Sequence, residues 1–267
     1  MSNDNEADQQ YVMADVEHHA ERGRLEKLEL LHDAATTRRL DAICIQPGWR
    51  CVEIGAGAGS IALELSSRVG TNGLVLAADI DPRFLDDFDG PGKDLITHDI
   101  TAGPVPPGDF DFAHCRAVLT HVDDLPATVD NLVASVHPGG WLLCEEPDYG
   151  SMAACDPDHP HAADLASFHA IMTLSGRTNG YAGRQTFEAL RLAGLTEIES
   201  ETHGAIATGG SLLAQFRVDG LNNAKSMIME SGYFTEESFD RMLEMFHDPT
   251  FAYIENTWIA TRGRVPG

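Results

Sequence analysis

The chain has 267 residues, of which 43% are hydrophobic, and this suits one elaborated globular domain or one domain with a modest lid. Its 18 lysines and arginines stand against 42 aspartates and glutamates, which gives a formal net charge of −24. A surface with this charge repels nucleic acid and anionic membranes, so we expect neither as a partner.

The number of cysteines and the sequence of the amino terminus indicate the cellular compartment of the protein. Five cysteines without a Cys-x-x-Cys pair favour a reducing environment. The start lacks a basic and apolar leader pattern, and no apolar stretch approaches the roughly 18–20 residues that span a bilayer. The sequence therefore predicts a cytoplasmic protein.

Predicted helices and strands follow one another along the chain. Apolar spacing predicts helices from Val12 to Ile45, which end at the turn Gln46–Arg50. Strands and helices then alternate, and this alternation predicts an α/β fold whose parallel sheet is covered on both faces. The further elements are expected at Cys51–Gly57 (strand into turn), Ser60–Val69 (helix), Gly73–Ile80 (strand), Pro82 onward (short helix), Asp94–Ile100, Phe110–Arg116 and Trp141–Pro147 (strands, the last after a turn at His137–Gly140), and Phe251–Gly263 (final strand).

Composition divides the chain into four parts. We expect a helical segment at residues 1–45 and a cofactor-binding core at 46–147. A cap insertion at 148–183 is expected over the carboxyl edge of the sheet, and 184–267 should complete the core and the substrate pocket.

Three glycines stand where the first predicted strand meets the next helix. Gly55 permits a tight turn, Gly57 a close approach to a ligand, and Gly59 close packing of the helix. A structural turn without a ligand is the alternative. In a parallel sheet, however, such a junction typically carries a ligand across the top of the sheet.

The residues around the glycines favour one class of ligand. The spacing is Gly-x-Gly-x-Gly rather than the dinucleotide pattern, and Asp79 ends the next strand about 20 residues after Gly59, where a carboxylate can accept both ribose hydroxyls. Glu53 would repel a pyrophosphate at the helix amino terminus. The ligand should instead present a cationic or hydrogen-bond-donating group.

The motifs between Trp49 and Pro147 resemble, in order, those of class I S-adenosylmethionine-dependent methyltransferases, especially the ubiquinone/menaquinone-biosynthesis-like subgroup of small-molecule enzymes. The matching segments are VEIGAGAGS, LAADIDP, THDI, FDFAHCRAVLTHVDD and HPGGWLLCEEPD. The resemblance implies a Rossmann-like, mostly parallel sheet of about seven strands with the last one antiparallel. It also implies S-adenosylmethionine as cofactor and a small-molecule methyl acceptor as partner, and a homodimer stays open.

The resemblance implies roles for residues at the methionine end of the cofactor. Glu53 and the loop Gly55–Gly59, including Ala56 and Gly57, would hold the amino-carboxylate group. Cys115 and Arg116, at the end of the fourth strand, would wrap the methionine portion.

It likewise implies roles at the nucleoside end. Asp79 would bind the ribose and Ile80 would pack on the adenine. Asp99 would accept the adenine amino group, and Ile100 would donate its backbone N–H.

Two other methyltransferase branches fit less well. The sequence has no Asn-Pro-Pro-Tyr-like segment after the fourth strand, which enzymes acting on nucleic-acid bases carry. Glu145 and Glu146 resemble the paired acids of protein arginine methyltransferases, but they follow the fifth strand rather than the fourth.

One histidine is the preferred catalytic candidate. Methyl transfer mainly needs alignment, yet a histidine can take the proton of a phenol or alcohol acceptor. His121 lies just after the fourth strand and suits this role, and the alternative is that it only flanks the next helix. His114 is expected to point into the packing of the sheet.

The segment Cys155–Asp164 crowds acids and histidines. A metal site is one reading, but its two prolines favour a solvated turn, and we predict no metal. Aromatic and methionine residues after Pro147 are expected to wall an apolar pocket. Tyr11 and the amino-terminal helices are expected to close over the cofactor, as such segments do in enzymes that the sequence resembles. The wall candidates are Tyr149, Met152, Phe168, Met172, Tyr181 and Phe216.

Two functions compete with methyl transfer. One is an S-adenosylmethionine-binding protein that has lost transfer or catalyses a non-methylating reaction. The other is a nicotinamide-dependent oxidoreductase, which would need a pyrophosphate beside Glu53.

Overall fold

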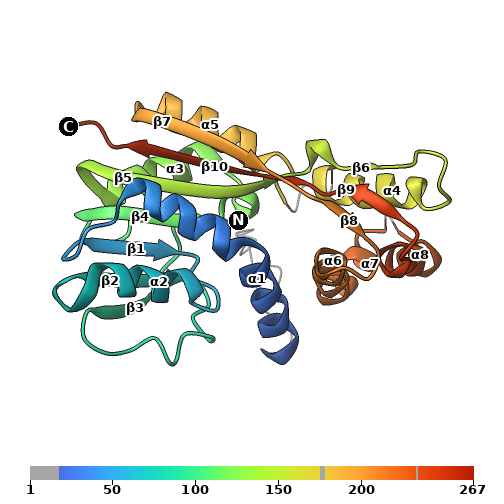
Figure 1. Ribbon diagram of the computed structural model, residues 1–267, viewed down its shortest axis with the longest axis horizontal. Coiled ribbons are helices and arrows are strands. Elements are labelled where there is room, and N and C mark those ends of the chain that lie inside the picture. Colours follow the sequence, from blue (N-terminus) through green and yellow to red (C-terminus); the bar gives the residue numbers. More distant parts are fainter. Residues whose placement is uncertain (1–17, 175–177, 233) are drawn as a thin grey trace, which may run out of the picture.

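A seven-stranded sheet forms the centre of the protein (Figure 1). The computed structural model describes residues 18–174, 178–232 and 234–267. The strand order is β3-β2-β1-β4-β5-β10-β7, and the last strand along the chain, β10, runs antiparallel to both of its neighbours. The prediction of an α/β fold with seven strands and an antiparallel last strand is confirmed. The strands are β1 Arg50–Ile54, β2 Leu74–Asp79, β3 Lys93–Thr97, β4 Phe110–Arg116, β5 Val136–Asp148, β7 Thr196–His203 and β10 Thr257–Arg264.

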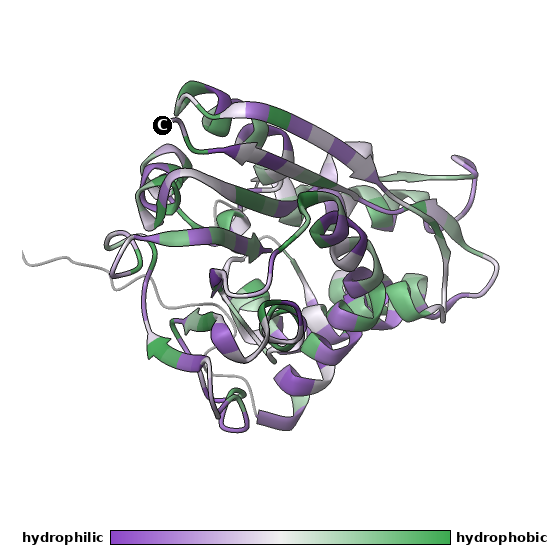
Figure 2. Cartoon of the chain, turned by 60° about the vertical axis from the view of Figure 1, so that its left-hand side comes forward, coloured by the Kyte–Doolittle hydropathy of each residue, from purple (hydrophilic) through white to green (hydrophobic). Residues whose placement is uncertain are grey.

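Helices cover both faces of this sheet. The second half of α1 (His18–Ile43) and α2 (Ser60–Val69) pack on one face. The other face is covered by α3 (Leu125–Ser135) and α5 (Ala182–Leu192). Central strands such as β1 and β2 are buried on both sides, which explains their nearly continuous apolar sequences. Figure 2 shows the contrast with the edge strand β7, which is largely hydrophilic and exposed.

A second layer, here called the cap, stands at the carboxyl ends of the strands (Figure 1). It combines a three-stranded sheet of order β6-β9-β8 with four helices around a core of its own. Its chain comes from two separate stretches, one between β5 and α5 and one between β7 and β10. The cap elements are β6 Ala153–Ala154, α4 Ala162–Leu174, β8 Ile206–Thr208, α6 Leu212–Asn223, α7 Lys225–Glu230, α8 Glu236–His247 and β9 Ala252–Ile254.

Three local expectations are wrong. The segment after Pro82 forms two successive turns instead of a helix, because Leu85 N–H bonds to Pro82 and Phe88 N–H to Leu85 without continuing. The expected turn at His137–Gly140 lies inside β5, where a bulge absorbs it against β4. The expected final strand is split into β9 and β10, which belong to different sheets.

The amino-terminal region is one helix over its described part. Helix α1 runs unbroken for 26 residues, and Tyr11 lies outside the described residues. In the part of the chain that the structure describes, no helix has the length and apolarity needed to cross a membrane.

Candidate functional site

A cavity of about 470 Å³ opens at the carboxyl ends of β1, β2 and β4. The strand order reverses between β1 and β4, which is where open α/β sheets bind ligands. Loops of the sheet form one end of the cavity, cap helices form the other, and the first half of α1 lines its side.

The three glycines form the loop between β1 and α2. All have positive φ, with values of +70° at Gly55, +56° at Gly57 and +93° at Gly59, a region that side-chain-bearing residues rarely adopt. A Cβ at Gly55 would clash with Val118, and one at Gly59 would lie 2.8 Å from Leu85. Gly57 and Ala56 line the cavity, whereas Gly59 packs beside it. The fold itself therefore demands Gly55 and Gly59.

Acidic and apolar residues follow β2 and β3 along the same rim. Asp79 accepts hydrogen bonds from the backbone N–H of Gly57 and of Asp81, both at 2.8 Å. Burial raises the pKa of its carboxyl group. Asp99 holds its own turn by accepting from Thr101 N–H at 2.8 Å. Both carboxylates line the cavity.

Ile80 and Ile100 complete this end of the cavity. Ile80 is 46% exposed, so its side chain is available to cover a ligand, whereas Ile100 is buried. The structure thus brings together all four residues expected at the nucleoside end.

Glu53 reaches the cavity from a buried chain of charges. Its carboxylate pairs with His114 Nδ1 at 2.7 Å, and His114 Nε2 lies 3.6 Å from Glu145. Burial alone would lower the pKa of His114, but the two carboxylates, Glu53 foremost, raise it to about 9. Glu145 is in turn paired with Arg39 at 2.8 Å. His114 is therefore buried within the sheet packing, as expected, and it lies there as a cation between two acids.

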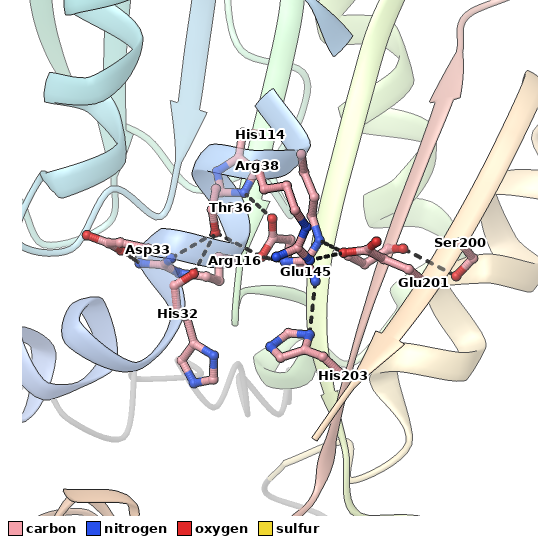
Figure 3. A network of polar contacts seen from close by, with 12 residues as sticks. His32, Asp33, Thr36, Arg38, His114, Arg116, Glu145, Ser200, Glu201 and His203 are labelled. Atoms are coloured by element: carbon pink, nitrogen blue, oxygen red, sulfur yellow. Dashed lines mark hydrogen bonds and ion pairs between the residues drawn. The ribbon is translucent and has the colours of Figure 1, made fainter. Parts of the chain in front are cut away.

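Arg116 and Cys115 take opposite directions at the end of β4. Arg116 lines the cavity and donates to Asp33 and Thr36 of α1, at 2.9 and 3.0 Å (Figure 3). Cys115 is 1% exposed and lies in the apolar core beside Cys144, outside the lining of the cavity. Successive strand residues face opposite sides, so only one of the pair can reach the site.

His121 lies in a short 3-10 turn after β4 and lines the cavity. Burial, and then the charge of Arg24, lower the pKa of its imidazole to about 4. The ring is therefore neutral at neutral pH, and a pKa this low makes it a weak base.

Sequence reasoning expected the amino-terminal helices to close over the cofactor site, but it missed which residues of α1 line the cavity. Leu25, Leu28 and Glu29 line the cavity, and Glu29 accepts from Ser60 N–H at 3.2 Å, in the first turn of α2. Helical spacing predicted the helix, but no local signal indicated which part would meet the glycine loop.

Sequence reasoning also missed Arg217 of α6. This residue is 8% exposed, lines the cavity and pairs with Glu255. Of the expected wall residues, Tyr149, Phe168, Met172 and Phe216 line the cavity, while Met152 and Tyr181 do not.

The segment Cys155–Asp164 forms a polar turn in the cap. His161 pairs with Asp164 at 3.0 Å and lies 3.6 Å from Asp248. Within residues 18–174, 178–232 and 234–267, no group of three histidine, cysteine or acidic side chains is placed to hold a metal ion.

Comparisons with known proteins agree with this arrangement. A family described as "Methyltransferase domain" matches residues 17–225. A 37.1 kDa protein in a transposon of Streptomyces fradiae, described as uncharacterized, is 25% identical over 228 residues, which cover 80% of this chain and 63% of that protein. The methyltransferase str3 of Strobilurus tenacellus is 30% identical over 100 residues, which cover 38% of this chain. This chain spans only 36% of that relative's length.

Solved structures share the fold. The YcgJ protein of Bacillus subtilis superposes with a TM-score of 0.59 at 16% identity, covering 88% of this chain and 100% of that one. At this identity the likeness shows the fold alone.

Proposed function

The chain belongs to the methyltransferase-domain family, and on that premise we propose that it transfers a methyl group from S-adenosylmethionine to an O, N or C atom of a small molecule. One observation carries this proposal. A single cavity joins the glycine loop and the rim carboxylates at one end to an apolar chamber in the cap at the other. Such a cavity can hold two molecules end to end.

The residues at the sheet end suit the proposed cofactor. Asp79 keeps lone pairs for ribose hydroxyls beyond its two backbone bonds, and Ile80 offers an apolar face for adenine. Asp99 and Ile100 lie next to it for the adenine edge. Glu53 supplies negative charge for an ammonium group. Carboxylates that meet cationic and hydrogen-bond-donating groups in this way are the expected partners of a charged nucleoside.

A dinucleotide fits this end poorly. In dinucleotide-binding folds the pyrophosphate lies at the amino terminus of the helix after the glycine loop. Here the carboxylate of Glu29 accepts from Ser60 N–H at that place, and Glu53 lies at the end of β1. Two carboxylates would repel a diphosphate, which supports a sulfonium nucleoside over a nicotinamide cofactor.

When bound, S-adenosylmethionine supplies a methyl group on positively charged sulfur, so that bond formation to the acceptor and cleavage of the carbon–sulfur bond coincide and the electron pair stays on sulfur. The chain's own task is to align the acceptor and exclude water. Where the acceptor is a hydroxyl, His121 is the candidate to take its proton because it lies at the cavity wall, and its low pKa makes it a weak base in this role.

Calorimetry on the purified chain tests the cofactor. We expect S-adenosylmethionine and S-adenosylhomocysteine to bind, and NAD to give no heat of binding. Measurable NAD affinity without affinity for either sulfur nucleoside would overturn the proposal. A turnover assay for S-adenosylhomocysteine with a panel of acceptors then separates a transferase from a protein that only binds the cofactor.

The substitution Asp79→Ala sharpens this test. It should weaken S-adenosylhomocysteine binding by roughly 5- to 150-fold, corresponding to about 1–3 kcal/mol for charge-assisted hydrogen bonds to a buried partner. Asp94→Ala, at an exposed acid on β3, is the matched control and should leave the affinity unchanged. Equal affinities of both variants would remove Asp79 from the site.

A further inference from the structure

The cap end of the cavity has an apolar wall. Side chains from three cap helices build most of it: Phe168, Ile171, Met172, Phe216, Leu221 and Ile228. Such a wall favours a ligand that gains free energy from losing its hydration.

The cations of the cavity are already neutralised. Each of the four arginines among the described residues that line it has a carboxylate partner. The pairs are Arg24–Glu21 (2.6 Å), Arg83–Asp81 (3.1 Å), Arg116–Asp33 (2.9 Å) and Arg217–Glu255. An acidic acceptor would have to break one of these pairs to find a counter-ion, and breaking a buried pair is costly.

Three aromatic rings of the cap surround a position that a cation of the protein already occupies. The guanidinium of Arg217 lies 5.3 Å from the ring of Tyr149, 5.9 Å from Phe168 and 5.3 Å from Phe216. These are cation–π distances, so the protein's own cation occupies the place where an amine or quaternary ammonium would bind. A cationic acceptor therefore has no aromatic site here.

The hydroxyl group of Tyr149 can still donate one hydrogen bond. Its hydroxyl oxygen accepts from Arg217 Nη1 at 3.0 Å, so its single proton points elsewhere. Among the described residues, no side chain or backbone group accepts a hydrogen bond from this hydroxyl, and Tyr149 lines the cavity. An oxygen of a bound molecule would satisfy it.

We propose that the methyl acceptor is an uncharged, largely apolar molecule that fills the cap end of the cavity and accepts a hydrogen bond from the Tyr149 hydroxyl through one of its oxygens. This inference rests on the proposed function, since it assigns the acceptor of that same site.

Calorimetry on the full chain, saturated with S-adenosylhomocysteine, tests the charge preference. The probes are 2-naphthol, 2-naphthoate and 2-naphthylmethylammonium, which share one ring system and differ in charge. We expect 2-naphthol to bind at least about 10-fold more tightly than either ion. The inference would be overturned if either ion bound as tightly as 2-naphthol. It would also be overturned if 2-naphthol gave no heat of binding at a probe concentration of about 1 mM, which sets the weakest affinity that counts as binding. Failure of S-adenosylhomocysteine itself to bind would instead overturn the proposed function.

A variant pair tests the hydrogen bond. In Tyr149→Phe the preference for 2-naphthol over 2-methylnaphthalene should fall by roughly 5- to 10-fold. Tyr253→Phe is the matched control, because Tyr253 belongs to the same cap core but does not line the cavity, and it should keep the preference. An unchanged preference in Tyr149→Phe would contradict the assignment of Tyr149.

A second substitution keeps the inference testable if Tyr149→Phe fails to bind S-adenosylhomocysteine. Met172→Lys places an unpaired cation in the wall of the cap end. It should shift the preference by about 10-fold or more from 2-naphthol to 2-naphthoate. No shift would show that the probes bind elsewhere.

Discussion

At the scale of single residues, two histidines seven positions apart in the sequence differ in charge. His114 lies between Glu53 and Glu145, which raise its pKa to about 9 against the effect of burial. For His121, burial and then the charge of Arg24 lower the pKa to about 4. The same residue type thus serves as a fixed cation in one place and as a neutral ring in the other.

The charge of Arg24 can be tested directly on His121. In Arg24→Gln the pKa of His121 should rise from about 4 toward its ordinary value, because a nearby positive charge is removed. NMR titration of the imidazole measures this shift. Arg22→Gln is the control, since Arg22 pairs with Glu26 at 3.2 Å on the exposed side of α1. An equal response to both substitutions would contradict a local effect of Arg24.

At the scale of elements, two arginines adjacent in the sequence of α1, Arg38 and Arg39, attach this helix to the sheet, and they differ in burial. Arg39 is 6% exposed at its side chain and pairs with the buried Glu145. Arg38 is 61% exposed and pairs with the half-exposed Glu201. Figure 3 shows Arg38 reaching from α1 toward Glu201 of β7.

This difference predicts unequal losses of stability. Arg39→Ala should lower the free energy of unfolding by roughly 3–5 kcal/mol, because it removes the closest cationic partner of the buried Glu145. Arg38→Ala should cost about 1 kcal/mol or less, as is typical of exposed pairs. Urea unfolding curves give both values. Losses of equal size would show that Glu145 keeps enough stabilisation from His114 and Thr36.

Elements set by local sequence could be predicted, and contacts between distant segments could not. The glycine loop, Asp79 and Asp99 depend on short spacings beside strands, so sequence alone indicated their place at one rim. The pair Arg217–Glu255 joins residues 38 positions apart, and no local pattern signals it. Cys115 and Arg116 show what sequence cannot predict within one strand. Side chains alternate between the two faces of a strand, but this alternation does not tell which of the two residues faces the site.

At the scale of the whole molecule, His114 ties stability to pH. Its folded pKa of about 9 lies above its ordinary value of 6.5, so the stabilisation is complete below pH 6.5 and is lost as the pH rises through about 9. Between these values the loss should amount to roughly 1–3 kcal/mol of unfolding free energy.

Thermal unfolding at several pH values tests this linkage. The melting temperature of the wild type should fall between pH 7 and 10, and His114→Gln should show a flatter dependence over that window. His32→Gln is the control, because burial lowers the pKa of His32 and keeps it neutral there. If His114→Gln retained the full slope, the charged state of His114 would be excluded.

The places where the chain leaves and re-enters the sheet all meet at one edge. Strand β5 ends at Asp148, which is opposite Thr257 at the start of β10, and Trp258 is opposite His203 at the end of β7. Three of the chain connections between the cap and the sheet therefore lie side by side, on the adjacent strands β5, β10 and β7. Replacement of the cap at these connections would change the apolar end of the cavity and leave the glycine loop and the rim carboxylates unchanged. The same cofactor end of the cavity would then serve different methyl acceptors.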